Sequence, residues 1–182
     1  MRPNPLERIP MLTLRCTQKL MRRLKVPTKV ETLAPTTVLG DWYANLIYAR
    51  PQQLVLCMNE RSLLLVLVPA REGQSLPNRF RASALSLLHR IGVPSRSVEA
   101  EASAMSEINF GPTANRRVVG CMREAAFALS LEFESRRFKT VEEIEDYFCE
   151  YIYSPTDYRH PGELAVELFS LASSASTVAR IH

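Results

Sequence analysis

Apolar residues are densest between residues 42 and 68, where three short runs are separated by tight links. The runs over 42–48, 53–58 and 62–68 are rich in aromatic and branched side chains, which favour strands. Links this short, the first containing Pro51, force consecutive strands to pair antiparallel. The third run lacks apolar–polar alternation, which predicts that both of its faces are buried. We therefore expect an antiparallel β-meander over about 42–68 with helices on both sides.

Most of the remaining chain has the apolar spacing of helices. Val118, Met122, Ala125 and Leu129 recur at three- and four-residue intervals, so they share one helical face. The same reasoning, with capping residues and prolines as boundaries, predicts helices over about 18–24, 76–91, 95–105, 115–135, 141–153 and 163–171, and short strands over 11–14 and 107–110. The expected fold is α+β: an antiparallel meander plus one or two extra strands, packed with four to six helices.

The predicted elements suggest one main unit with irregular ends. Residues 1–10 contain three prolines and no apolar stretch, which is typical of a disordered leader rather than a signal peptide. Residues 11–172 are expected to form a single domain, and an alternative division makes 136–172 a helical appendage. The Ser/Ala-rich segment 173–182 is expected to be a frayed tail.

Composition narrows the class of protein. Apolar residues make up 46% and charged residues 23% of the chain, the usual balance of a globular protein. The four cysteines include no C-x-x-C pair, which suits a reducing compartment and predicts a cytoplasmic location. The longest apolar run, 63–69, is far shorter than the ~20 residues that span a bilayer, so no membrane contact is expected.

Basic residues concentrate at the start of the chain, although the net charge is only +4. Residues 1–30 hold eight lysines and arginines against Glu7 alone, and such a front can attract polyanions or remain a solvated face. A second basic group opens the helix predicted over 115–135, where arginines oppose the helix dipole and free N–H groups suit a phosphate. A salt bridge to the acidic C-terminal half is the alternative. The candidate anion- or nucleic-acid-binding residues are Arg15, Lys19, Arg22, Arg23, Asn115, Arg116 and Arg117.

A second candidate site lies at the ends of the meander. Period-two alternation places Tyr43 and Asn45 on one strand face, with Asp41 just before them and Glu60 and Arg61 in a later link. These side chains could line a pocket, although an aromatic residue in a strand is more often a core anchor. No residue is assigned a catalytic role.

Other chemistries have little support in the chain. The three histidines and four cysteines have no metal-ligand spacing, and no glycine-rich phosphate loop occurs, so neither a metal nor a cofactor is expected. The carboxylates over 142–150 are distributed around a helix and are interpreted as a solvated surface.

Four segments resemble a bacterial family without an assigned activity that is associated with plasmid open reading frames. They are LRCTQKL at 14–20, TTVLGDWYANL at 36–46, QLVLCMNER at 53–61 and NRRVVGCM at 115–122. The resemblance spans about residues 11–135 and implies no reaction, cofactor or catalytic residue.

Three functions remain open at this point. The first is a non-enzymatic binding or regulatory protein that contacts nucleic acid through a basic surface. The second is a small hydrolase or nuclease-like enzyme with its site at the meander ends. The third is a protein–protein interaction module. The oligomeric state is left open by the sequence.

Overall fold

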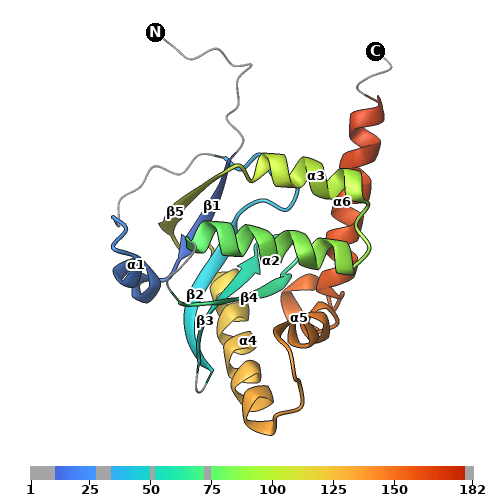
Figure 1. The fold of residues 1–182 in the computed structure, drawn as a ribbon. Coiled ribbons are helices and arrows are strands. Elements are labelled where there is room, and N and C mark those ends of the chain that lie inside the picture. The colour runs from blue at the N-terminus through green and yellow to red at the C-terminus, as the bar shows by residue number, and fades with distance from the viewer. Residues whose placement is uncertain (1–10, 28–33, 50–51, 72–74, 179–182) are drawn as a thin grey trace.

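The computed structural model describes residues 11–27, 34–49, 52–71 and 75–178. Its centre is a five-stranded sheet in the order β4-β3-β2-β1-β5 (Figure 1). The strands are β1 (Met11–Cys16), β2 (Trp42–Ala49), β3 (Gln52–Asn59), β4 (Leu65–Pro69) and β5 (Glu107–Pro112). The predicted leader, residues 1–10, lies outside the described residues.

The predicted meander is confirmed. β2 pairs antiparallel with β3, Trp42 opposite Asn59, and β3 pairs antiparallel with β4, Leu56 opposite Leu67. β4 begins later than the sequence predicts, because residues 60–63 form the turn and Leu63 adopts a φ of +61°.

The sheet is mixed, which corrects the expectation of a purely antiparallel meander with added strands. β1 pairs parallel with β2, Leu14 opposite Trp42, and also parallel with β5, Met11 opposite Glu107. Parallel neighbours need a long crossover connection. Residues 17–41, including one helix, connect β1 to β2. Two helices then carry the chain from β4 at one edge of the sheet to β5 at the opposite edge, beside β1.

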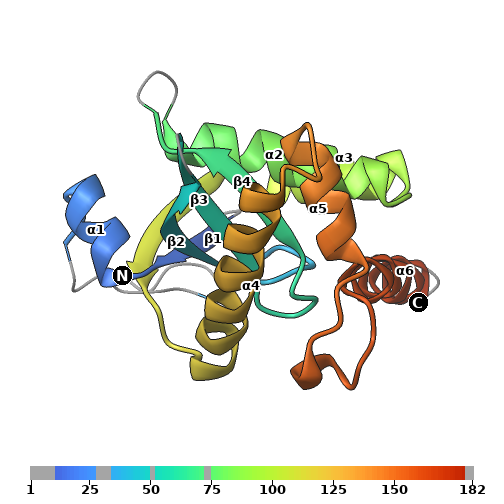
Figure 2. The same ribbon diagram turned by 90° about the horizontal axis from the view of Figure 1, so that it is seen from below.

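Helices cover both faces of the sheet. They are α1 (Gln18–Leu24), α2 (Leu76–Arg90), α3 (Ser95–Ala104), α4 (Arg116–Ser135), α5 (Val141–Cys149) and α6 (Pro161–Val178), with a 3-10 turn, η1, at Ser154–Thr156. α4 crosses the sheet on one side, while α2 and α3 lie on the other (Figure 2). In the described part of the chain, no helix has the length and apolar character required to cross a bilayer.

The core divides into two clusters because side chains alternate between the two faces of each strand. Val66 and Val68 of β4 belong to the cluster that contains α1, α2, α3 and α6 residues, and Leu65 and Leu67 belong to the cluster beneath α4 and α5. The prediction that this strand is buried on both faces is therefore confirmed.

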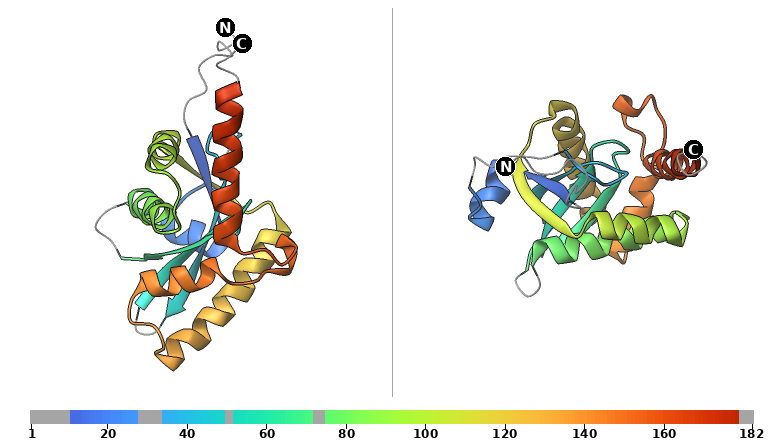
Figure 3. Two further views of the ribbon diagram at one scale, coloured as in Figure 1. Left: turned by 90° about the vertical axis from the view of Figure 1, so that its right-hand side faces the viewer. Right: turned by 90° about the horizontal axis from the view of Figure 1, so that it is seen from above.

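The last helix is longer than its apolar pattern predicts. Ala165 and Phe169 are buried in the first cluster, but α6 continues to Val178, and its final turns extend past the other described elements (Figure 3).

Candidate functional site

The residues predicted to line a pocket at the meander ends form a hydrogen-bonded junction. Asp41 is buried, and its carboxylate accepts the Thr13 backbone N–H at 3.0 Å and the Arg15 Nε–H at 2.8 Å. The Asp41 N–H donates to Glu60 Oε1 at 3.0 Å. The carboxylate thus binds β1 while the backbone N–H of the same residue binds the β3–β4 turn, so Asp41 ties the two together.

The β3–β4 turn is organised by the Asn59 side chain. Its Oδ1 accepts the backbone N–H groups of Arg61 and Ser62 at 3.0 and 2.9 Å. Facing the turn, Gly40 has a φ of +75°, and a Cβ at that position would lie 2.6 Å from Glu60 Oε1. The positive φ favours glycine here, and a larger residue would also displace the Glu60 carboxylate from the Asp41 N–H.

The other predicted pocket residues are also held by neighbouring elements. The Tyr43 hydroxyl accepts the Asn115 N–H at 3.1 Å, and burial raises the pKa of Tyr43. Asn45 Oδ1 accepts the Thr17 hydroxyl at 3.0 Å. Arg61 Nη1 donates to a backbone carbonyl of the facing loop at 2.8 Å. These side chains therefore form hydrogen bonds that link neighbouring strands, helices and loops.

All four segments that carry the family resemblance meet at this junction. Arg15 comes from the first, Asp41 and Tyr43 from the second, Glu60 from the third and Asn115 from the fourth. Direct hydrogen bonds join the first to the second, the second to the third and the second to the fourth. These contacts give a structural reason why the four segments occur together in one chain.

The basic residues predicted to bind an anion lie on two sides of the sheet. α1 packs into the first core cluster and α4 into the second. The first side carries Lys19, Arg22 and Arg23, and the second carries Arg116 and Arg117. Arg15, on β1, is held by Asp41. The other predicted basic residues are therefore carried by helices that cover opposite faces of the sheet.

The start of α4 is capped by Asn115 and has no acidic side chain. Asn115 Oδ1 accepts the Arg117 N–H at 3.0 Å, and the first turn contains no Asp or Glu. Carboxylates of the acidic helix α5 pair with Arg90 of α2 instead.

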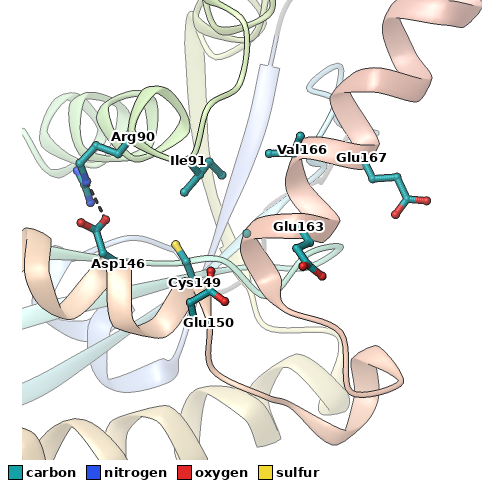
Figure 4. Close-up of a pocket in the computed structure, with 9 residues that line it drawn as sticks. Arg90, Ile91, Asp146, Cys149, Glu150, Glu163, Val166 and Glu167 are labelled. Carbon is teal, nitrogen blue, oxygen red and sulfur yellow. Dashed lines mark hydrogen bonds and ion pairs between the residues drawn. The ribbon is translucent and has the colours of Figure 1, made fainter.

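A cavity of about 560 Å³ opens between the end of α2, α5 and α6. Its apolar part comes from Ile91, Cys149 and Val166, and Ile91 and Val166 point toward each other across it (Figure 4). Close packing of the two C-terminal helices forms its base, since a Cβ on Gly162 would lie 3.3 Å from the Cys149 Cβ.

Negative charge dominates the rim of this cavity. Four carboxylates and one guanidinium line it: Asp146, Glu150, Glu163, Glu167 and Arg90. Arg90 is already bonded to Glu145 at 2.7 Å and to Asp146 at 2.9 Å. Among the residues that the structure describes, Glu163 has no cationic partner, whereas Glu167 pairs with Arg159.

The buried Glu145 fixes Arg90 at this rim. One of its oxygens accepts the Leu67 backbone N–H at 2.9 Å, on the outer edge of β4, and the other accepts Arg90 Nη2. Burial raises the pKa of Glu145, against the opposing effects of these two donors. The Glu145 carboxylate therefore satisfies a backbone N–H of the edge strand β4 and positions the Arg90 guanidinium.

The thiol in the cavity is not poised for nucleophilic chemistry. Burial raises the pKa of Cys149 to about 12, whereas a reactive cysteine needs its thiolate form near neutral pH. No group of three or more His, Cys, Asp or Glu side chains in the described ranges could hold a metal ion.

A second cavity, of about 250 Å³, lies at the far end of the meander beneath the α4–α5 link. Phe133, Phe138 and Ile144 contribute to its lining, together with Lys139. It has no cluster of polar groups comparable with the acidic rim.

Sequence reasoning missed the acidic cavity. The carboxylates of α5 were interpreted as a solvated surface, and no local pattern links them to Arg90 or to α6. The sequence did contain one indication: the four-residue spacing of Glu163 and Glu167, with Val166 between them, places both carboxylates on one face of α6.

Comparison with known proteins places the chain in a family without a known activity. Residues 13–164 match the family described as "Domain of unknown function (DUF6933)", which extends past the 11–135 region of the resemblance. No curated protein and no solved structure matches the chain. Because the match covers most of its length, the chain belongs to the DUF6933 family.

Proposed function

We propose that this chain is a non-enzymatic binding protein and that the cavity between α2, α5 and α6 takes an organic cation. The observation that carries the proposal is the acidic rim: four carboxylates surround the opening, and its only lining cation, among the described residues, is already bonded to two carboxylates.

The shape and lining of the cavity support a ligand with an alkyl chain and a charged end. Its volume of about 560 Å³ is within the ~300–1,000 Å³ usual for ligand sites. Ile91 and Val166 offer apolar surface for methylene groups, and Glu163 offers an unpaired carboxylate for an ammonium or guanidinium. A lysine or arginine side chain of a partner protein and a free diamine share this chemistry.

The alternatives drawn from the sequence receive less support. A nucleic-acid surface needs its basic groups on one face, and those predicted here come from helices on opposite sides of the sheet. A hydrolase at the meander ends needs an available carboxylate, and both oxygens of Asp41 are bonded. The cytoplasmic location and the plasmid association implied by the resemblance remain predictions.

Isothermal titration calorimetry with cadaverine and with a short lysine-rich peptide tests the proposal and separates the two sources of the cation. The Glu163→Gln/Glu167→Gln variant should weaken binding about two- to thirtyfold, since each of the two exposed carboxylates that it removes contributes roughly 0.2–1 kcal/mol as an ion pair. Glu99→Gln, which removes one carboxylate from the exposed side of α3, should leave affinity unchanged.

Each outcome of these titrations either supports or refutes the proposal. Binding of both probes, or of one alone, with sensitivity to the Glu163/Glu167 change supports the cavity and identifies its preferred cation source. Absence of binding by either probe at low salt, or equal losses in the cavity variant and in the Glu99 control, refutes the proposal.

A further inference from the structure

The outer face of α4 exposes apolar side chains that no other described residue covers. Phe127 and Leu131 lie one turn apart and are 66% and 52% exposed. They are on the side of the helix opposite the buried residues Val118, Ala125 and Leu129, because three- and four-residue spacing defines one helical face. Together they form the apolar centre of this outer stripe.

Gly120 belongs to the same outer stripe. It is exposed in the first half of α4, and a Cβ added there would meet nothing within 4 Å. Glycine within a helix is less stable than alanine, so a single molecule gains nothing from its absent side chain. The position becomes advantageous when another surface approaches the helix backbone closely.

The charges along this stripe are basic at its start and acidic at its end, and the exposed Glu124, which accepts the Tyr151 hydroxyl, lies beside Arg123 in the middle. Arg116 and Arg123 lie in its first part and Glu134 near its end, and all three are exposed. Within the described residues none of the three forms an ion pair. A helix running in the opposite direction would present the complementary order.

We infer that α4 docks against α4 of a second copy of the chain as an antiparallel, two-fold symmetric pair. With the symmetry axis near Ala125, Arg116 lies opposite Glu134 and Gly120 opposite Leu131, and each of these contacts occurs twice. Arg123 then lies opposite Phe127, where a guanidinium can stack on the ring.

The self-complementary order favours a second copy over other occupants. A large side chain faces a glycine, a positive charge faces a negative one, and the two helix dipoles oppose each other. A single helix pair makes a small interface, so we expect a weak dimer that dissociates on dilution. The surface is separate from the acidic cavity, and the inference is independent of the function proposed for that cavity.

Sedimentation velocity over a concentration series of the full chain at low salt tests the inference. The wild-type protein should dimerise, and Phe127→Ser should weaken dimerisation at least tenfold, since buried aromatic residues dominate small interfaces. Arg116→Glu and Glu134→Arg should each weaken it, and the Arg116→Glu/Glu134→Arg double variant should restore it.

Gly120 gives a variant that separates folding from association. Gly120→Leu should melt at or above the wild-type temperature, because leucine favours the helix and has open space in the monomer, yet it should not dimerise. A wild-type chain that stays monomeric at every concentration refutes the inference. So does a charge-swapped double variant no better than the single changes, or a Gly120→Leu protein that dimerises normally.

Discussion

Replacing Glu145 tests whether one buried carboxylate holds the edge of the sheet. Its side chain is 3% exposed, accepts the Leu67 N–H at 2.9 Å and pairs with Arg90 at 2.7 Å. Glu145→Ala leaves the Leu67 N–H without an acceptor in a buried position, which costs roughly 1–3 kcal/mol. Loss of the charged bond adds about 1 kcal/mol, reduced because Arg90 keeps Asp146 and is partly exposed.

We therefore expect Glu145→Ala to lower the free energy of unfolding by about 2–4 kcal/mol. The neighbouring Asp146→Ala is a matched control, since it removes a carboxylate from the same arginine at a more exposed position, and it should cost only ~0.2–1 kcal/mol. Glu145→Gln retains an acceptor for the Leu67 N–H and should lie between the two.

Urea unfolding followed by circular dichroism measures all three variants, and equal m-values would show that they share one unfolding transition. A Glu145→Ala loss no larger than that of Asp146→Ala would refute the reasoning, because the bond to the strand edge would then contribute nothing. Greater aggregation of Glu145→Ala is also expected, since an uncovered edge strand can pair with other chains.

Two further predictions concern stability. Gly40→Ala should lower the unfolding free energy by about 2–3 kcal/mol, and Gly92→Ala by only about 1 kcal/mol. Both glycines have a positive φ, but only at Gly40 would a Cβ lie 2.6 Å from Glu60 Oε1. Equal urea midpoints for the two variants would contradict this prediction. Burial raises the pKa of Cys16 and Cys149 from 9.0 to about 12, so their contribution to stability is complete below pH 9 and is lost as the pH rises toward 12. Each thiol should lower the free energy of unfolding by about 1.4 kcal/mol per pH unit in that range. Cys149→Ala should therefore make the unfolding free energy, measured with urea, fall less steeply between pH 9 and 11. An unchanged pH dependence would contradict the raised pKa of Cys149.

The local part of the fold could be predicted from the sequence. Short links force β2, β3 and β4 into antiparallel neighbours, and the unbroken apolar run ending at Val68 predicts burial on both faces. The parallel pairing of β1 could not be predicted in the same way, because an apolar strand carries no sign of which distant strand lies beside it. The structure pairs Met11 with Glu107 through contacts that no local pattern encodes.

The candidate site was harder to predict for the same reason. The cavity joins three helices that are remote in sequence, and the carboxylates of α5 have the spacing of an ordinary solvated helix. Their burial and pairing depend on where Arg90 is placed by the packing of α2. The polar residues at the meander ends were identified from their chemistry, but their bonding partners emerged only from the structure.

The position of β1 has a consequence for the order in which the protein folds. This strand is made early in synthesis, yet one of its two neighbours, β5, follows only after the meander and two helices. Domains with many contacts between distant residues fold slowly, and nascent chains expose such strands until their partners emerge. We expect the β2–β4 meander to form first on the ribosome and β1 to dock between β2 and β5 in a later step.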